Sequence, residues 1–132
     1  MKIIRDFAKA YIQGDISGSV NIYCEQVLTG SKLVGAISII KNQEKIVREV
    51  VKSRQCKVYF DYPFTHERGV AYIYKYKFVL MLMKELWFHE KWKVEDTHTA
   101  SEIWITGKMF GYSDFEIAKY LEKHGYIKEP FK

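Results

Sequence analysis

The chain has 132 residues, the length of one ordinary domain, and 48% of them are hydrophobic. Ten Tyr, eight Phe and three Trp can fill a core without a metal or a disulfide, while two Pro and eight Gly are too few for a disordered chain. The net charge of +5 permits binding to nucleic acid or to an acidic protein but does not require it. We therefore predict one domain over residues 1–132, mainly α and compact, with an α+β alternative that contains one short β-hairpin around 56–77.

Three helices are expected before the middle of the chain, over residues 2–13, 17–28 and 31–54. Gly14 ends the first helix and Gly30 ends the second, because glycine commonly follows the last helical turn. The third helix is predicted from apolar residues that recur at close to the helical period of 3.6. These residues are Leu33, Ala36, Ile40, Val47, Val50 and Val51.

The middle of the chain fits two secondary structures. Aromatic-rich alternation over residues 56–62 and again over 70–77 predicts a β-hairpin. A helix over residues 66–89, capped by Thr65, is the alternative, since apolar residues from Tyr72 to Leu86 also follow helical spacing. We expect a helix over 77–89, and residues 70–76 remain open between strand and helix.

Two capping boxes begin the helices of the C-terminal third. Residues 99–102 read Thr-Ala-Ser-Glu and residues 113–116 read Ser-Asp-Phe-Glu, in which the first hydroxyl and the last carboxylate can satisfy free backbone N–H groups. They predict helices over about 100–110 and 114–124, the second ending at Gly125. The two helices are expected to pack as a helical hairpin.

The segment Gly111–Leu121 reads G-Y-S-x-x-E-I-A-x-x-L and resembles the first half of a bacterial helix-turn-helix. That resemblance implies a tight turn followed by a recognition helix that enters the major groove. The next residues, Glu122–Pro130, do not supply such a helix. We therefore interpret the segment as a capped helix pair that packs on the core, with a degenerate DNA-binding element as the alternative.

A basic stripe is expected on the predicted helix over 31–54. Lys41, Lys45, Arg48 and Lys52 lie at i, i+4, i+7 and i+11, so they share one helical face opposite the apolar residues. Such a stripe can follow a phosphate backbone or an acidic groove on another protein. The alternative is a solvated face that only keeps the protein soluble.

An aromatic interface is the second candidate binding site. Tyr72, Tyr74 and Tyr76 alternate with Lys75 and Lys77, a pattern typical of platforms on which bases stack beside cations. Tyrosines also suit protein interfaces, because they add large contact area at low entropic cost. The alternative is that these rings are packing residues of the fold.

Catalytic and metal-binding motifs are weak in this sequence. His89-Glu90 is not followed by the second histidine of a zinc protease motif. A cluster of His89, Glu90, Asp96 and His98 would support a third hypothesis, an enzyme, but no spacing enforces it. The chain also has no glycine-rich phosphate loop and no G-x-S-x-G elbow. We predict no catalytic residues, no metal and no cofactor.

The compartment is predicted from thiols and hydropathy. Cys24 and Cys56 form no C-x-x-C pair, so we expect free thiols in a reducing cytoplasm. Charged residues recur every few positions in the N-terminal segment, so it cannot be the apolar region of a secretory signal peptide. The longest apolar run, residues 78–83, is too short to cross a bilayer. No membrane partner is therefore expected.

The tail W-I-T-G-K-M-F-G-Y-S-D-F-E-I-A-K-Y-L resembles small uncharacterised proteins of Gram-positive phages and mobile elements, over residues 99–124. Anti-CRISPR and other anti-defence inhibitors belong to that pool. The resemblance implies a stoichiometric inhibitor or modulator of a host protein or ribonucleoprotein, such as a CRISPR nuclease, acting in the host cytoplasm. A homodimer is compatible with the aromatic content. The alternative is a nucleic-acid-binding regulator that uses the basic stripe and the truncated helix-turn-helix.

Overall fold

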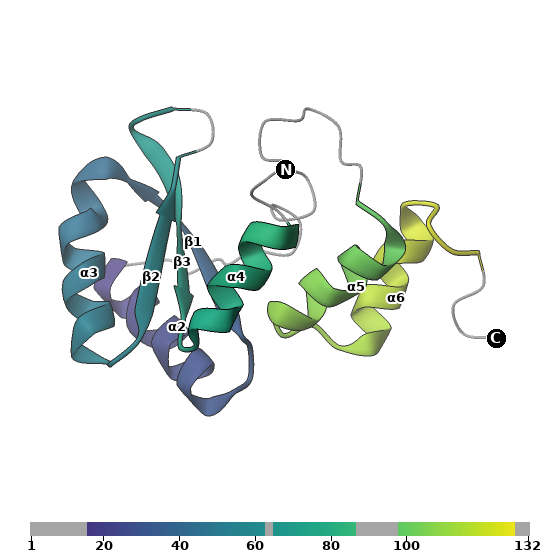
Figure 1. Cartoon of the computed structure of the whole chain (residues 1–132), viewed down its shortest axis with the longest axis horizontal. Helices are drawn as coiled ribbons and strands as arrows, with labels where there is room; N and C mark the ends of the chain where they lie inside the picture. The colour runs from purple at the N-terminus through teal and green to yellow at the C-terminus, as the bar shows by residue number, and fades with distance from the viewer. Residues whose placement is uncertain (1–15, 63–64, 87–97, 129–132) are drawn as a thin grey trace.

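A three-stranded sheet lies between two layers of helices (Figure 1). The computed structural model describes residues 16–62, 65–86 and 98–128, so the helix expected over 2–13 lies outside the described residues. The elements in chain order are α2 (Ile16–Thr29), β1 (Val34–Ile40), the 3₁₀ helix η1 (Lys41–Gln43), α3 (Glu44–Ser53), β2 (Lys57–Asp61), β3 (Arg68–Tyr74), α4 (Lys77–Leu86), α5 (Ala100–Met109) and α6 (Asp114–Lys123).

The last strand in sequence, β3, is the central strand of the sheet. It pairs antiparallel with β1 on one side and with β2 on the other, so the strand order is β1-β3-β2. Ala71 and Ile73 of β3 pack with α2 and α3 on one face of the sheet. Tyr72 and Tyr74 pack with α4, α5 and α6 on the opposite face. All four side chains are at most 6% exposed, so β3 contributes to both cores.

The prediction of a mainly α domain with at most one hairpin is wrong, because the sheet has a third strand and the fold is α+β. The hairpin is confirmed as β2 and β3, but β1 occupies the first part of the helix predicted over 31–54. The sequence of β1, Val-Gly-Ala-Ile-Ser-Ile-Ile, is rich in β-branched residues, which favour strands. Only pairing with the distant β3 shows that its helical spacing is coincidental.

Gly35 allows α2 to pack closely against β1. A Cβ atom at this position would lie 2.5 Å from Cδ1 and 2.8 Å from Cγ of the Tyr23 ring. Tyr23 is 3% exposed, and it belongs to the core between the sheet and α2. The glycine therefore creates the space that this ring fills.

The helical hairpin of the C-terminal third is confirmed. The Thr99 and Ser113 side chains accept hydrogen bonds from the N–H groups of Glu102 and Glu116, both at 3.2 Å, and both capping boxes are complete. The Leu33 N–H donates to the Met109 carbonyl at 2.8 Å, which joins α5 to the start of β1. The residues that resemble a helix-turn-helix are thus part of the packed fold, and no helix follows α6 up to residue 128, where the description ends.

Four helices end in turns of the same type. In each turn a residue with positive φ follows the helix, and the N–H group of the next residue donates a hydrogen bond to a carbonyl in the last turn of the helix. After α3, the Gln55 N–H donates to the Lys52 carbonyl at 3.1 Å and the Cys56 N–H donates to the Val51 carbonyl at 3.0 Å. Gln55 has φ of +60°, a conformation that costs energy for any residue other than glycine. The positive-φ residues of the other three turns are Gly30, Gly111 and Gly125.

We expect Gly35→Ala to lower the free energy of unfolding by about 1–3 kcal/mol, because the added methyl group overpacks the Tyr23 ring. Urea unfolding, monitored by circular dichroism, measures the change in the free energy of unfolding. Gly18→Ala is the matched control, since a Cβ atom at Gly18 meets nothing within 4 Å. The control should be neutral or more stable by up to about 1 kcal/mol, because alanine favours a helix over glycine. Equal effects of the two substitutions would contradict the close packing at Gly35.

Candidate polyanion-binding surface

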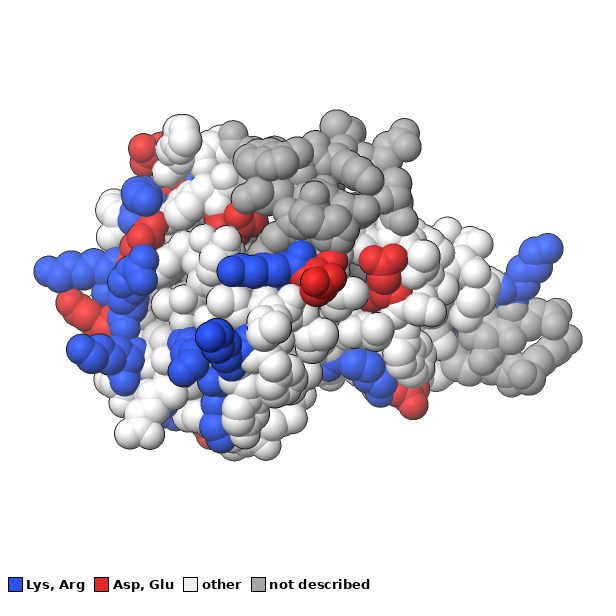
Figure 2. All heavy atoms as spheres, in the orientation of Figure 1, with Lys and Arg blue, Asp and Glu red and all other residues white. Residues whose placement is uncertain are grey.

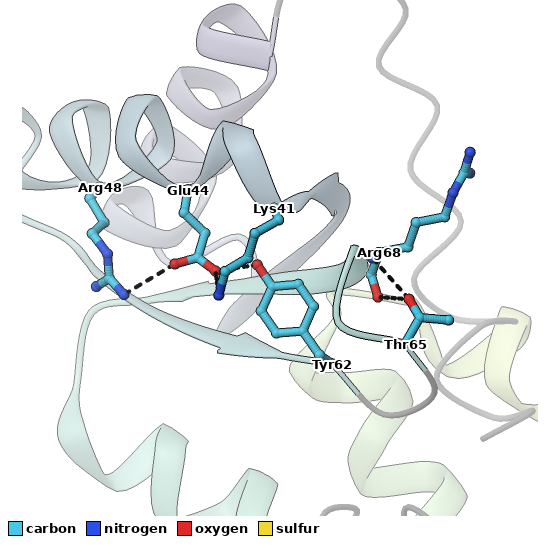
Figure 3. Close-up of polar contacts among 6 residues, drawn as sticks. All are labelled: Lys41, Glu44, Arg48, Tyr62, Thr65 and Arg68. Atoms are coloured by element: carbon cyan, nitrogen blue, oxygen red, sulfur yellow. Dashed lines mark hydrogen bonds and ion pairs between the residues drawn. The ribbon is translucent and has the colours of Figure 1, made fainter.

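The four cations of the predicted basic stripe are all exposed. Lys41 lies in η1 and the other three lie along α3, on the side opposite the buried Val47 and Val51. Glu44 interrupts the stripe at its N-terminal end, as Figure 3 shows. Its carboxylate pairs with Lys41 Nζ at 3.0 Å and with Arg48 Nη2 at 3.6 Å.

The Glu44 carboxylate also accepts a hydrogen bond from the Tyr62 hydroxyl (Figure 3). That bond, with smaller contributions from Lys41 and Arg48, holds the pKa of Glu44 below its ordinary value. Desolvation, followed by the bond to the carboxylate, raises the pKa of Tyr62 to about 12. At neutral pH Glu44 is therefore an anion that neutralises one end of the stripe.

Further along α3, cations lie without the local compensation that Glu44 provides. Among the residues that the structure describes, Lys45 and Lys52 have no carboxylate partner. The Arg48 guanidinium carbon lies 4.6 Å from the centre of the Phe60 ring, a cation–π contact that joins α3 to β2. The exposed side of α3 and the neighbouring edge strand β2 therefore form one surface.

Strand pairing adds a second group of cations to this surface. Lys57 of β2 is opposite Tyr74 of β3, so the start of β2 lies beside the segment that leads from β3 into α4. Neither residues 50–60 nor residues 68–84 contain Asp or Glu. We call the combined surface the basic face; its cations are Lys45, Arg48, Lys52, Arg54, Lys57, Lys75 and Lys77.

Figure 2 shows Lys and Arg side chains gathered over α3 and over the end of the sheet where β2 begins and β3 ends. A few carboxylates are interspersed with them. The α3 residues were predicted from helical spacing alone. Arg54 and Lys57 follow them in sequence, but only the pairing with β3 places Lys75 and Lys77 close to the same surface.

The predicted aromatic interface is divided between the core and the surface. Tyr72 and Tyr74 are only 2% and 6% exposed, and desolvation raises the pKa of both hydroxyls. They are packing residues and not an exposed platform. Tyr76 is 49% exposed and stacks on Phe78, with ring centroids 5.6 Å apart and planes inclined by 18°.

Phe78 was not predicted as a binding residue, although it is 50% exposed. The signal was present in α4, because burial of Val79 and Met83 on one side of the helix turns Phe78 and Met81 toward solvent. Lys75 Nζ lies 5.0 Å from the centre of the Tyr76 ring. An exposed aromatic pair therefore lies beside the cations that follow β3.

The histidine and carboxylate cluster considered for an enzyme is mostly outside the described residues, since His89, Glu90 and Asp96 lie in the range 87–97. His98 is buried, with Nε2 2.8 Å from the Leu86 carbonyl oxygen. Within residues 16–62, 65–86 and 98–128, no group of three or more His, Cys, Asp or Glu residues could hold a metal ion. In those same ranges, no helix combines the length and apolar character needed to cross a membrane.

We expect Tyr62→Phe to raise the pKa of Glu44 toward its ordinary value, because the substitution removes the hydrogen bond that contributes most to its lowering. A lowered carboxyl pKa stabilises the fold above the unfolded-state pKa, and this stabilisation disappears as the pH falls through the folded-state value. The variant should therefore lose less stability on acidification than the parent. NMR titration of the Glu44 carboxyl carbon measures the shift.

Tyr76→Phe is the control for this titration, because Tyr76 is exposed and stacks on Phe78 instead of contacting Glu44. It should leave the titration of Glu44 unchanged. An unaltered Glu44 pKa in Tyr62→Phe would show that the ion pairs with Lys41 and Arg48, rather than the tyrosine, set it.

Comparison with known proteins gives no matching family model, no matching curated sequence and no matching solved structure.

Proposed function

We propose that this chain is a non-catalytic binding protein that inhibits or modulates a host protein or ribonucleoprotein in the host cytoplasm, and that the basic face docks on the partner. An anti-defence inhibitor of the anti-CRISPR type is the role that the phage-like tail suggests. The observation that carries the proposal is the convergence of cations from α3, β2 and the β3–α4 segment beside stretches without any carboxylate.

The electrostatics support a partner that presents many negative charges. The Lys41 and Arg48 side chains are 57% and 61% exposed, although their partner Glu44 is only 17% exposed, so both cations remain accessible to phosphates from the solvent side. Lys45 and Lys52 have no such pair to break. A ribonucleoprotein supplies phosphates together with protein surface, which fits a face that combines cations with exposed rings.

The exposed rings add contact area that is not electrostatic. Tyr76, Phe78 and Met81 are 49%, 50% and 60% exposed. Aromatic residues and methionine are enriched in protein interfaces, and aromatic rings also stack on unpaired bases. The same patch can therefore contact either the protein or the RNA of a ribonucleoprotein partner.

A nucleic-acid-binding regulator is the second candidate, and the stacked Tyr76–Phe78 pair beside Lys75 is the observation that favours it. This candidate differs from the one based on a truncated helix-turn-helix. The α6 helix ends at a turn through Gly125, and no recognition helix is present between that turn and residue 128. In this candidate, the basic face and the Tyr76–Phe78 pair bind the nucleic acid.

We expect the combined variant Lys45→Glu, Lys52→Glu, Arg54→Glu, Lys57→Glu to lose partner binding by about 100-fold or more, because it replaces attraction to phosphate with repulsion. Tagged wild-type and variant chains are expressed in cells, and copurified proteins and RNA are identified and quantified. The wild type should retain one specific protein or ribonucleoprotein that the variant loses. The melting temperature should remain close to that of the wild type, since all four side chains are exposed.

Lys123→Glu with Lys128→Glu is the matched control, because it reverses exposed cations in and after α6, on the other side of the molecule from α3. It should retain the partner. Retention of the same partner by the basic-face variant would contradict the proposal, as would loss of the partner in both variants.

Salt dependence separates the two candidate functions. We expect a regulator that binds nucleic acid directly to bind purified single strands with an affinity that falls steeply with salt, and each phosphate-contacting lysine replaced by glutamine should reduce the logarithmic slope by about 1. Fluorescence anisotropy with labelled RNA and DNA measures this slope. Weak binding to both the labelled RNA and the labelled DNA, together with a protein partner that still copurifies after nuclease treatment, would favour the inhibitor or modulator.

A further inference from the structure

The two cysteines of the chain lie close together, although they are 32 positions apart in the sequence. Cys24 is in α2 and Cys56 is in the turn between α3 and β2. The Cys56 Sγ lies 3.9 Å from the Cys24 carbonyl oxygen, so the Cys56 side chain contacts the backbone of Cys24. Both are free thiols.

The two thiols differ in their access to solvent. Cys24 is fully buried in the core between the helices and the sheet, whereas Cys56 is partly exposed. Desolvation, followed by the neighbouring Cys56, raises the pKa of Cys24 to about 12. Cys24 therefore stays protonated at neutral pH, and Cys56 is the thiol that an oxidant in solution reaches.

We propose that Cys56 and Cys24 form an oxidant-responsive pair, in which a peroxide oxidises Cys56 and Cys24 then closes an intramolecular disulfide. The Cys56 thiolate attacks one peroxide oxygen, the O–O bond breaks, and the departing hydroxide takes up a proton to become water. The Cys24 sulfur attacks the resulting sulfenic acid, its S–H proton passes to the departing hydroxyl group, and a second water leaves. Two thiols and one hydrogen peroxide thus give one disulfide and two waters.

The fold holds the resolving thiol beside the reacting one. The turn after α3 fixes Cys56 through the bond from its N–H to the Val51 carbonyl at 3.0 Å, and Cys24 lies in the same core as Val51. Because the Cys56 Sγ already contacts the backbone of Cys24, the two side chains need only a local rearrangement to reach the short distance of a disulfide. The disulfide would tie α2 to the turn that carries Arg54 and directly precedes Lys57 of β2, whatever the basic face binds.

Treatment of the full chain with hydrogen peroxide tests the proposal. We expect both thiols to become unreactive toward an alkylating reagent, the intact mass to fall by two hydrogen atoms, and peptide mapping to find Cys24 linked to Cys56. A dithiol reductant should restore both thiols. Since the chain has only these two cysteines, every product can be assigned.

Two variants separate the steps. Cys24→Ala removes the resolving thiol, so a sulfenic-acid probe such as dimedone should label Cys56 after peroxide treatment. Cys56→Ala leaves only the buried thiol, which should remain unlabelled under the same conditions, and thermal unfolding shows that each variant is folded. Accumulation of sulfenic acid in the wild type, a disulfide between two chains, or faster oxidation of Cys24 than of Cys56 would overturn the proposal.

Discussion

The pairing of β3 with both of its neighbours is the constraint on which the rest of the structure depends. Its backbone hydrogen bonds join β1 to β2, and its side chains enter the core on both faces of the sheet. Ala71 and Ile73 are fully buried on the side of α2 and α3, and Tyr72 and Tyr74 are almost fully buried on the other. A strand that is covered on both faces cannot be displaced without opening both cores, so the two helical layers are fixed relative to each other through β3.

The same pairing determines where the charges lie. Without it, the cations of α3 and those around Lys75 would belong to separate segments, and the register of Lys57 opposite Tyr74 brings these segments together. Glu44 partly neutralises this positive charge, since it forms ion pairs with Lys41 and Arg48. The side chains of these two cations are 57% and 61% exposed. Because both cations remain exposed while Glu44 is only 17% exposed, the pairs orient the cations and leave them accessible to a further anion.

Local signals in the sequence were sufficient for several elements. The capping boxes at Thr99 and Ser113 and the glycine at residue 125 each depend on contacts within one turn, and the structure confirms them. The β2–β3 hairpin also has a local signal, the aromatic alternation. The structure resolves the alternatives in favour of a strand for residues 70–74, and residues 75 and 76 form a bend that leads into α4.

The errors came from features that depend on distant contacts. The pattern from Leu33 to Ile40 fits a helix until its hydrogen-bonding partner, β3, is known. The alternation of Tyr72, Tyr74 and Tyr76 indicated a shared face, but burial of that face is decided by α4, α5 and α6, which pack over the first two rings only. The proximity of Cys24 and Cys56 likewise follows from the packing of α2 and carries no sequence motif.

The central position of β3 also affects how the protein can fold during its synthesis. Ribosomes extend a chain at about 5–20 residues per second, so β1 emerges a few seconds before the strand it must pair with. β2 cannot substitute, because the place beside β1 belongs to β3. During this interval the uncharged segment Val-Gly-Ala-Ile-Ser-Ile-Ile has no partner strand. Such segments are prone to intermolecular β-pairing, and a nascent chain of this protein is therefore most vulnerable to aggregation before residue 74 leaves the ribosome.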